Sequence, residues 1–284
     1  MIHCGRSSIK GLFLASIAYA PLVLGLGWSA ANKIETAASE KVKVELYYES
    51  QCPGCRQLIT TSFSEAFKAE GFLDMADVQF IPYGNAQETP SSDGTFDFQC
   101  QHGPSECIYN LIETCALAKI QDPIVSFDFI DCIEHNDESR GEHEVYYYYE
   151  IAMSCAKLVD LADATISQME QCALSKEGNE LEHEAALRTD SLDPPHKYVP
   201  HVVVDGEHTD EIQDAVTDSL LNYVCGAYDG PEKSAVCSAV AATNLRVGAD
   251  NHEYPPAKER EVCYRRDGSS STTIGEDTST IAEE

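Results

Sequence analysis

The chain has 284 residues, of which 48 are acidic and 19 are basic, so its formal net charge is −29. Such a charge repels nucleic acids and anionic membranes, and the sequence shows no basic patch, so we predict no nucleic-acid partner. A solvated surface plus an acidic tail is the simplest explanation of the charge. The alternative is adaptation to an acidic compartment, where many carboxylates become protonated.

Residues 1–31 have the pattern of a secretory signal peptide. Arg6 and Lys10 precede an apolar run over 11–28, and small residues ending at Ala31 follow it as at a cleavage site. The alternative is an uncleaved signal anchor, because about 18 apolar residues approach membrane-spanning length. A proline and three glycines in the run favour cleavage, which would leave no stable membrane span and place the chain in the secretory pathway.

The run Val42–Tyr48 is apolar and β-prone, and it leads into the pair Cys52-Pro53-Gly54-Cys55 and a helical pattern over Pro53–Glu70. Cys52 therefore falls at a helix N-terminus, where unpaired N–H groups and the helix dipole stabilise a thiolate. Cys55 lies one turn on. We predict that Cys52 attacks and Cys55 resolves in thiol–disulfide exchange, with no cofactor besides an external thiol reductant.

A Cys-x-x-Cys pair is also half of a zinc site, and Cys100, His102 and Cys107 could supply the remaining ligands. The sequence holds no second Cys-x-x-Cys, and the flanking strand and helix favour the redox motif. We therefore predict no metal.

The chain has twelve cysteines, which is typical of an oxidising secretory route with structural disulfides. Loss of Cys4 with the leader and exclusion of the redox pair leave an odd number. One thiol is therefore expected to be free or joined to another chain in a disulfide-linked dimer, and Cys263 in the tail is the easiest candidate. The spacing does not reveal which cysteines pair.

A second strand is predicted at Val78–Pro82, followed by a turn-rich stretch over 89–95. The block from about 108 to 192 has mostly helical patterns separated by Asp, Asn and Gly breakers. The predicted helices are Ile108–Lys119, Ile124–Glu134, Glu144–Val159, Ala164–Leu174 and Glu180–Arg188.

Strand character returns at Val199–Val204, and a last helix is predicted at Glu211–Val224. This order predicts an α/β thioredoxin-like domain over 42–237, with a helical insertion between the two halves of its sheet. Pro200 inside a strand is explained if the Val199–Pro200 bond is cis and leaves a backbone edge beside the dithiol for an extended substrate. The alternative is a proline that only begins a strand. The acidic Ser/Thr-rich tail, 251–284, is predicted to be disordered.

The segment after the turn-rich stretch resembles the signature of the gamma-interferon-inducible lysosomal thiol reductases, C-Q-H-G-x-x-E-C-x-x-N-x-x-x-x-C. A Tyr-Tyr-Glu segment and a Cys-x-x-Cys pair also stand upstream, as in that family, and the resemblance spans about 42–237. The matching signature residues are Cys100, Gln101, His102, Gly103, Glu106, Cys107, Asn110 and Cys115.

The resemblance implies reduction of disulfides in folded or unfolded proteins, with electrons from a small thiol or a protein donor. It also implies a lysosome- or vacuole-like compartment, or secretion. Two features depart from the family. His201 stands where relatives often carry Trp, so a different substrate groove is expected, and the absence of Asn-x-Ser/Thr sequons puts sorting by mannose phosphate in doubt.

His102 has two interpretations: it assists proton transfer to a leaving thiolate, or it belongs to a disulfide-stapled loop. We favour the structural one, because a histidine protonated in an acidic lumen is a poor general base. Cys100, Cys107 and Cys115 are expected to form disulfides. Glu49 would oppose a thiolate on Cys52, so its side chain is expected to point away.

Two other functions fit the same pattern. A disulfide oxidase or isomerase of the secretory pathway differs only in reduction potential, which a few hydrogen bonds can change. A non-enzymatic module that binds client proteins with its dithiol locked is the third candidate.

Overall fold

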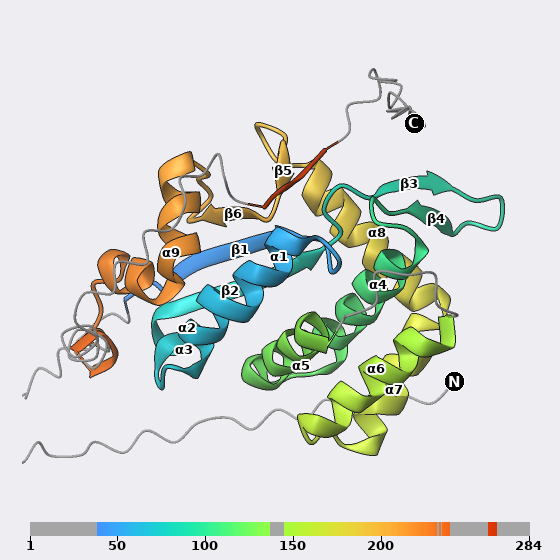
Figure 1. Cartoon of the computed structure of the whole chain (residues 1–284), viewed down its shortest axis with the longest axis horizontal. Helices are drawn as coiled ribbons and strands as arrows, with labels where there is room; N and C mark the ends of the chain where they lie inside the picture. The colour runs from blue at the N-terminus through green and yellow to red at the C-terminus, as the bar shows by residue number, and fades with distance from the viewer. Residues whose placement is uncertain (1–38, 137–144, 232, 234, 239–260, 266–284) are drawn as a thin grey trace, which may run out of the picture. The chain divides into compact units, whose positions relative to one another are not determined.

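The computed structural model describes residues 39–136, 145–231, 233, 235–238 and 261–265 (Figure 1). The predicted signal peptide, 1–31, lies outside these residues. Among the helices that can be described, none combines the length and apolar character needed to cross a membrane.

The core of the fold is a sheet with strand order β2-β1-β6. Strand β1, Val42–Tyr48, pairs in parallel with β2, Ala76–Pro82, and antiparallel with β6, His201–Val204. The β1–β2 connection is helical, and β6 adds to the other side of β1 only after the long insertion. This is the predicted thioredoxin-like arrangement, and the predicted strand at Val42–Tyr48 is confirmed.

The predicted helix at Pro53–Glu70 is a helical run with a π-helical turn in its middle. It consists of α1, Pro53–Leu58, η1, Ile59–Phe63, and α2, Ser64–Lys68, and a short helix α3, Phe72–Met75, leads into β2. Apolar side chains that recur along this run pack on the sheet, because buried Ile59, Phe63 and Phe67 share one face. The start of α1 is therefore held rigidly against the end of β1.

The insertion is helical, as predicted, and gathers on one side of the sheet (Figure 1). Two disulfides, Cys115–Cys172 and Cys132–Cys155, join its helices around a second apolar core. Its helices are α4, Pro104–Lys119, α5, Pro123–Asn136, α6, Val145–Leu158, α7, Asp163–Ala173, and α8, Lys176–Asp190.

A hairpin between β2 and the insertion was not predicted from the sequence. Strands β3, Gln87–Pro90, and β4, Phe96–Gln99, flank the turn-rich stretch and pair antiparallel. The hairpin depends on a distant residue, since the Asn179 side chain donates to Phe96 O and accepts from Phe96 N, both at 2.8 Å. Such a tertiary anchor has no local sequence signal.

After the insertion, a two-residue strand β5, Tyr198–Val199, leads through a cis Val199–Pro200 bond into β6, so the predicted cis proline is confirmed. Helix α9, Asp210–Ala227, packs against η1 and α2. Strand β7, Cys263–Tyr264, pairs antiparallel with β5 (Figure 1). Disorder was predicted throughout 251–284, and it is wrong for 261–265; the rest of that tail lies outside the described residues.

Glu182 of α8 is a buried carboxyl inside the fold. Its side chain accepts a hydrogen bond from Thr114 Oγ1 at 2.8 Å, and burial, more than its neighbour Glu113, raises its pKa to about 8. In an unfolded chain a Glu ionises near ~4.3. The stability associated with the neutral carboxyl is therefore fully present below that pH and is lost as the pH rises through about 8.

We expect Glu182→Gln to flatten the decline of stability with pH. Between about pH 7 and about pH 9 this carboxyl alone costs the wild type on the order of 1 kcal/mol of unfolding free energy, and the amide cannot ionise. Urea unfolding at both pH values measures the difference. Glu184→Gln, at an exposed position of the same helix, should behave as the wild type does. Equal slopes for the wild type and Glu182→Gln would contradict the prediction.

Candidate active site

Cys52 lies at the start of α1, as predicted. It is the N-cap residue, with extended backbone, Pro53 follows at the first helical position, and Arg56 N donates to Cys52 O at 3.0 Å. Cys55 lies inside the first turn, and both cysteines are buried. The helix N-terminus thus presents its unpaired N–H groups toward the first cysteine of the pair.

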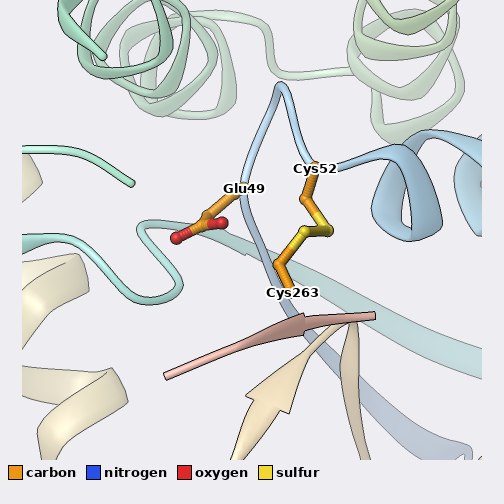
Figure 2. A group of neighbouring side chains, drawn as sticks. All are labelled: Glu49, Cys52 and Cys263. Atoms are coloured by element: carbon orange, nitrogen blue, oxygen red, sulfur yellow. A yellow bond between two sulfur atoms is a disulfide. The ribbon is translucent and has the colours of Figure 1, made fainter. Parts of the chain in front are cut away.

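The sulfur of Cys52 is joined to that of Cys263 in the tail (Figure 2). The expectation that Cys263 is free or bonded to another chain is therefore wrong for this form of the chain. Among the described residues, the unpaired cysteine is Cys55. An odd number of cysteines does leave one thiol unpaired, but that thiol is Cys55 and not Cys263. The spacing of the cysteines says nothing about where a distant tail binds.

Cys55 is held as a thiol. Its side chain has no exposed surface, and burial raises its pKa well above the ordinary value. The backbone N–H of Glu49 donates to Cys55 Sγ at 3.5 Å and partly opposes this effect. A thiol in this position can act on the neighbouring sulfur only after it loses its proton, which is the behaviour required of a resolving cysteine.

Glu49 lies beside the sulfurs of Cys52 and Cys263, so the expectation that its side chain lies away from them is wrong (Figure 2). A carboxylate oxygen, Cys52 Sγ and Cys263 Sγ all lie within 4.8 Å of one another. The loop after β2 closes over Glu49, because Gly84 has a φ of +60° and a Cβ there would overlap the Glu49 side chain. The spacing of the sequence could not show this closure.

Burial keeps Glu49 uncharged at ordinary pH. Its side chain has no exposed surface, and burial, with a smaller contribution from Glu106, raises its pKa to about 9. The hydrogen bond from Asn85 N to Glu49 Oε1, at 2.7 Å, acts in the opposite direction. The acid near the sulfurs is therefore a neutral proton donor over the range in which most proteins work.

His102 lies between two buried acids and the disulfide. Its Nδ1 lies 2.5 Å from Glu106 Oε2 and 3.6 Å from Glu49 Oε2, while its Nε2 lies 3.6 Å from Cys263 Sγ. A second bond from His102 N to Glu106 Oε1, at 3.0 Å, fixes the residue to α4. In its protonated form the ring donates through both nitrogens, so one proton points at the tail sulfur.

The other signature residues support the loop between β1 and α1. Asn110 Oδ1 accepts from Ser50 N at 3.0 Å, and Glu106 O accepts from Ser50 Oγ at 3.2 Å. Gly103 begins α4 with a φ of +102°, a value that favours glycine. The signature therefore places α4 directly beneath the dithiol.

The remaining cysteines of the signature form disulfides, as expected. Cys100 is joined to Cys107, and Cys115 to Cys172. With the first two sulfurs bonded to each other, they are not metal ligands in this form, which removes the thiols that the zinc interpretation needed. Cys225 and Cys237 also pair.

The predicted substrate edge lies beside Cys52. Val199 O is 3.7 Å from Cys52 Sγ, and Val199 and Tyr198 pair with the tail strand β7. His201, by contrast, is only 4% exposed, and burial, more than the neighbouring His208, lowers its pKa to about 3. Its ring packs in the interior against His208 and Tyr47, and it also touches the Tyr198 ring of the edge, with ring centroids 6.3 Å apart.

Asn85 is a site residue that sequence reasoning did not single out. Its side-chain amide donates to Cys263 O at 2.9 Å and to Gln101 Oε1 at 2.7 Å, and Gln101 donates in turn to Tyr264 O at 2.9 Å. Asn85 lies within the span 42–237 that resembles the family, but it is not a signature residue, and nothing in the sequence pattern indicated a contact with the tail.

Residues 43–159 match the family "Gamma interferon inducible lysosomal thiol reductase (GILT)". The chain is 40% identical to the gamma-interferon-inducible lysosomal thiol reductase of Carassius auratus, over 82% of this chain and 89% of that protein. The corresponding protein of Mus musculus is 34% identical over 74% and 77% of the two chains. The "Gamma-interferon-responsive lysosomal thiol protein" of Arabidopsis thaliana is 32% identical over 74% and 82%.

Among solved structures, DsbA of Chlamydia trachomatis aligns with a TM-score of 0.43 and 14% identity, over 62% of this chain and 85% of that chain. BdbD of Bacillus subtilis, in its oxidised form, aligns with a TM-score of 0.43 and 13% identity, over 62% and 86%.

Glu49→Gln tests whether the carboxyl beside the sulfurs is neutral. A carboxylate within 4.8 Å of Cys52 Sγ would oppose a thiolate there by about 3 kcal/mol at an effective dielectric constant of about 20, roughly a hundredfold in thiolate population. Because Glu49 is protonated below its pKa of about 9, we expect fully reduced variant and wild type to alkylate at Cys52 within about threefold between about pH 5 and 7. A hundredfold gain in the variant would mean that Glu49 is ionised.

Proposed function

The chain belongs to the gamma-interferon-inducible lysosomal thiol reductase family and is a thiol–disulfide oxidoreductase; we propose that Cys52 and Cys55 reduce protein disulfides in an acidic, lysosome-like compartment. The observation that carries the assignment is the pair of inequivalent sulfurs. Cys52 lies at a helix N-terminus and bonds to the sulfur of another segment, while Cys55 is a buried thiol behind it.

In the first step, Cys52 attacks one sulfur of a substrate disulfide as a thiolate. The Cys52–substrate disulfide forms, the substrate disulfide breaks, and the other substrate sulfur leaves and takes up a proton. The helix N-terminus stabilises the attacking thiolate, and the neutral Glu49 carboxyl adds no opposing charge. Cys52 performs this step only in chains whose bond to Cys263 has been reduced.

In the second step, Cys55 loses its proton and attacks Cys52 Sγ. A Cys52–Cys55 disulfide forms, and the bound substrate sulfur departs and takes up a proton, so two electrons and two protons have reached the substrate. The Glu49 N–H that points at Cys55 Sγ favours the transient thiolate. Burial of Cys55 in turn prevents external disulfides from reaching it.

His102 supplies the proton to the departing sulfur. In the Cys52–Cys263 disulfide, Cys263 Sγ occupies the place of a substrate sulfur, and His102 Nε2 lies 3.6 Å from it. Glu106 Oε2, 2.5 Å from Nδ1, holds the ring in the orientation that points Nε2 at this sulfur. This replaces our preference for a purely structural histidine, since an acid is needed at this point of the cycle and a protonated ring in an acidic lumen is suited to the task.

An external thiol completes the cycle by reducing the Cys52–Cys55 disulfide, and the chain needs no other cofactor. The donor is a small thiol or a protein dithiol, and the substrates are disulfide-bonded or unfolded proteins. Cleavage of the leader releases the chain into the lumen without a membrane anchor. A disulfide-linked dimer forms only from chains in which the internal Cys52–Cys263 bond has opened, because Cys263 is otherwise occupied.

Cysteine replacements separate the two steps. We expect Cys52→Ser to abolish turnover of a protein disulfide, because the nucleophile is lost. We expect Cys55→Ser to trap a covalent complex with substrate, visible on a non-reducing gel. The double variant Cys225→Ser/Cys237→Ser, which removes a disulfide at the end of α9, should keep turnover. Retained turnover in Cys52→Ser would rule out the assignment.

His102→Asn tests the proton donor. We expect the variant to accumulate the Cys52–substrate disulfide in a single turnover, because the second sulfur must leave unprotonated. The loss should exceed about tenfold for alkyl disulfides, whose thiols have high pKa values, and be small for an aromatic disulfide whose acidic thiols leave as stable thiolates. A loop that needs His102 only for its structure would lower both rates equally, and that result would contradict the role.

A further inference from the structure

Residues 261–265 lie across the active site as an extended segment. The segment is joined to Cys52 through Cys263 and runs antiparallel to β5, with Val199 opposite Cys263 and Tyr198 opposite Tyr264. A further bond from Arg265 N to Lys197 O, at 2.9 Å, extends the pairing by one residue. This is how an extended polypeptide adds a strand to an exposed sheet edge.

Two side chains outside β5 also bind the main chain of the same segment. Asn85 and Gln101 donate to the carbonyl oxygens of Cys263 and Tyr264, both at 2.9 Å. The orientation of the Asn85 amide is itself fixed, because His196 Nε2 lies 3.2 Å from Asn85 Oδ1. Burial lowers the pKa of His196 to about 4, so its ring is neutral and able to donate to that oxygen.

Gly54, between the two cysteines of the pair, provides the space for the segment. A Cβ on Gly54 would overlap the carbonyl oxygen of Glu261 and lie 3.3 Å from Pro200 Cδ. Only a glycine lets a passing backbone approach so closely at this point. The surface beside Cys52 therefore matches a polypeptide main chain in shape as well as in hydrogen bonding.

Apart from the cysteine, the side chains of the segment make only surface contacts. The Tyr264 ring lies 6.2 Å from that of Tyr198, and Arg265 pairs with the exposed Asp190 at 3.3 Å, a kind of contact that contributes little. Cys263 is 9% exposed, whereas Tyr264 is 65% exposed and projects from the segment. A site that binds the backbone around a cysteine and leaves the next side chain in solvent accepts many sequences.

We propose that residues 261–265 are an intramolecular substrate analogue, bound as a mixed disulfide, and that Asn85 and Gln101 hold the main chain of extended polypeptide substrates in the same groove. The inference rests on the proposed function, since it uses Cys52 as the attacking residue. It adds a substrate class, extended peptide around a cysteine irrespective of sequence, and a resting state in which the chain blocks its own nucleophile.

Release of the segment needs no reductant for its first step. Cys55 attacks Cys52 Sγ, the Cys52–Cys263 bond breaks, a Cys52–Cys55 disulfide forms, and the proton of Cys55 passes to the Cys263 sulfur. Two equivalents of an external thiol then reduce the Cys52–Cys55 disulfide to the dithiol. The same external thiol that regenerates the dithiol during turnover therefore also converts the resting form into the active one.

The covalent part is tested on the full-length chain purified without reductant. Peptide mapping of the wild type should recover the Cys52–Cys263 pair, and turnover of a protein disulfide by a thiol donor should start after a lag. Cys263→Ser should remove both the pair and the lag, while Cys225→Ser/Cys237→Ser should keep both. Mapping that finds Cys263 unpaired in the wild type would overturn the resting state.

The binding part is tested in the Cys263→Ser background, where the groove is empty. We expect Asn85→Ala and Gln101→Ala each to raise KM for a peptide disulfide about fivefold, the value of one hydrogen bond, with kcat little changed. A small disulfide without peptide groups should show no change in either parameter. Equal losses on both substrates, or none on the peptide, would overturn the role of these residues.

Gly54→Ala gives an independent readout of the shared path. The added methyl group should prevent the Cys52–Cys263 pair in an otherwise wild-type chain and weaken peptide binding in the Cys263→Ser background. If Gly54→Ala prevented the Cys52–Cys263 pair but left peptide binding unchanged, or the reverse, the tail and the substrate would follow different paths. The proposed function fails separately, if Cys52→Ser retains turnover. Peptide mapping of the Cys52–Cys263 pair needs no turnover, so it tests the tail inference independently of the proposed function.

Discussion

The position of Cys52 Sγ, between the first turn of α1 and the backbone edge at Val199, is the constraint on which the site depends. The helix is anchored because Ile59, Phe63 and Phe67 are buried against the sheet, and the backbone at Val199 pairs with the tail strand β7 beside Cys52. An incoming polypeptide that pairs with β5 therefore brings its own cysteine sulfur to Cys52. The backbone pairing that binds the polypeptide thus also positions its sulfur for the exchange reaction.

The charge state of Glu49 decides whether this geometry can produce a nucleophile. A helix N-terminus contributes at most ~2 kcal/mol to an anion, whereas an ionised Glu49 within 4.8 Å would cost about 3 kcal/mol. Ionisation would therefore cancel the benefit of the helix. Burial and the neighbouring Glu106 prevent it by raising the pKa of Glu49 to about 9. Glu182 is a second buried acid with a raised pKa. Such acids reduce the free energy of unfolding least at low pH, where the unfolded chain also holds them protonated.

Much of this could be predicted from the sequence where local pattern and chemistry agree. The strand–Cys-x-x-Cys–helix order and the cis Val199–Pro200 bond are visible because each has a local signal. The orientation of Glu49 is set by the loop at Gly84, and the hairpin depends on Asn179, so both need tertiary contacts that no spacing reveals. The docking of Cys263 is the extreme case, since its partner lies 211 residues away.

A tail that carries its own cysteine also changes how the site meets its surroundings. Its effective concentration at the groove is far higher than that of any free substrate, because it is covalently part of the chain. In an oxidising lumen the Cys52–Cys263 bond therefore keeps the nucleophile closed to other thiols and disulfides. A thiol pool reducing enough to regenerate the Cys52–Cys55 dithiol also opens the tail, since both reactions end at the same sulfur. Activity is thereby linked to the compartment in which electrons for the reaction are supplied.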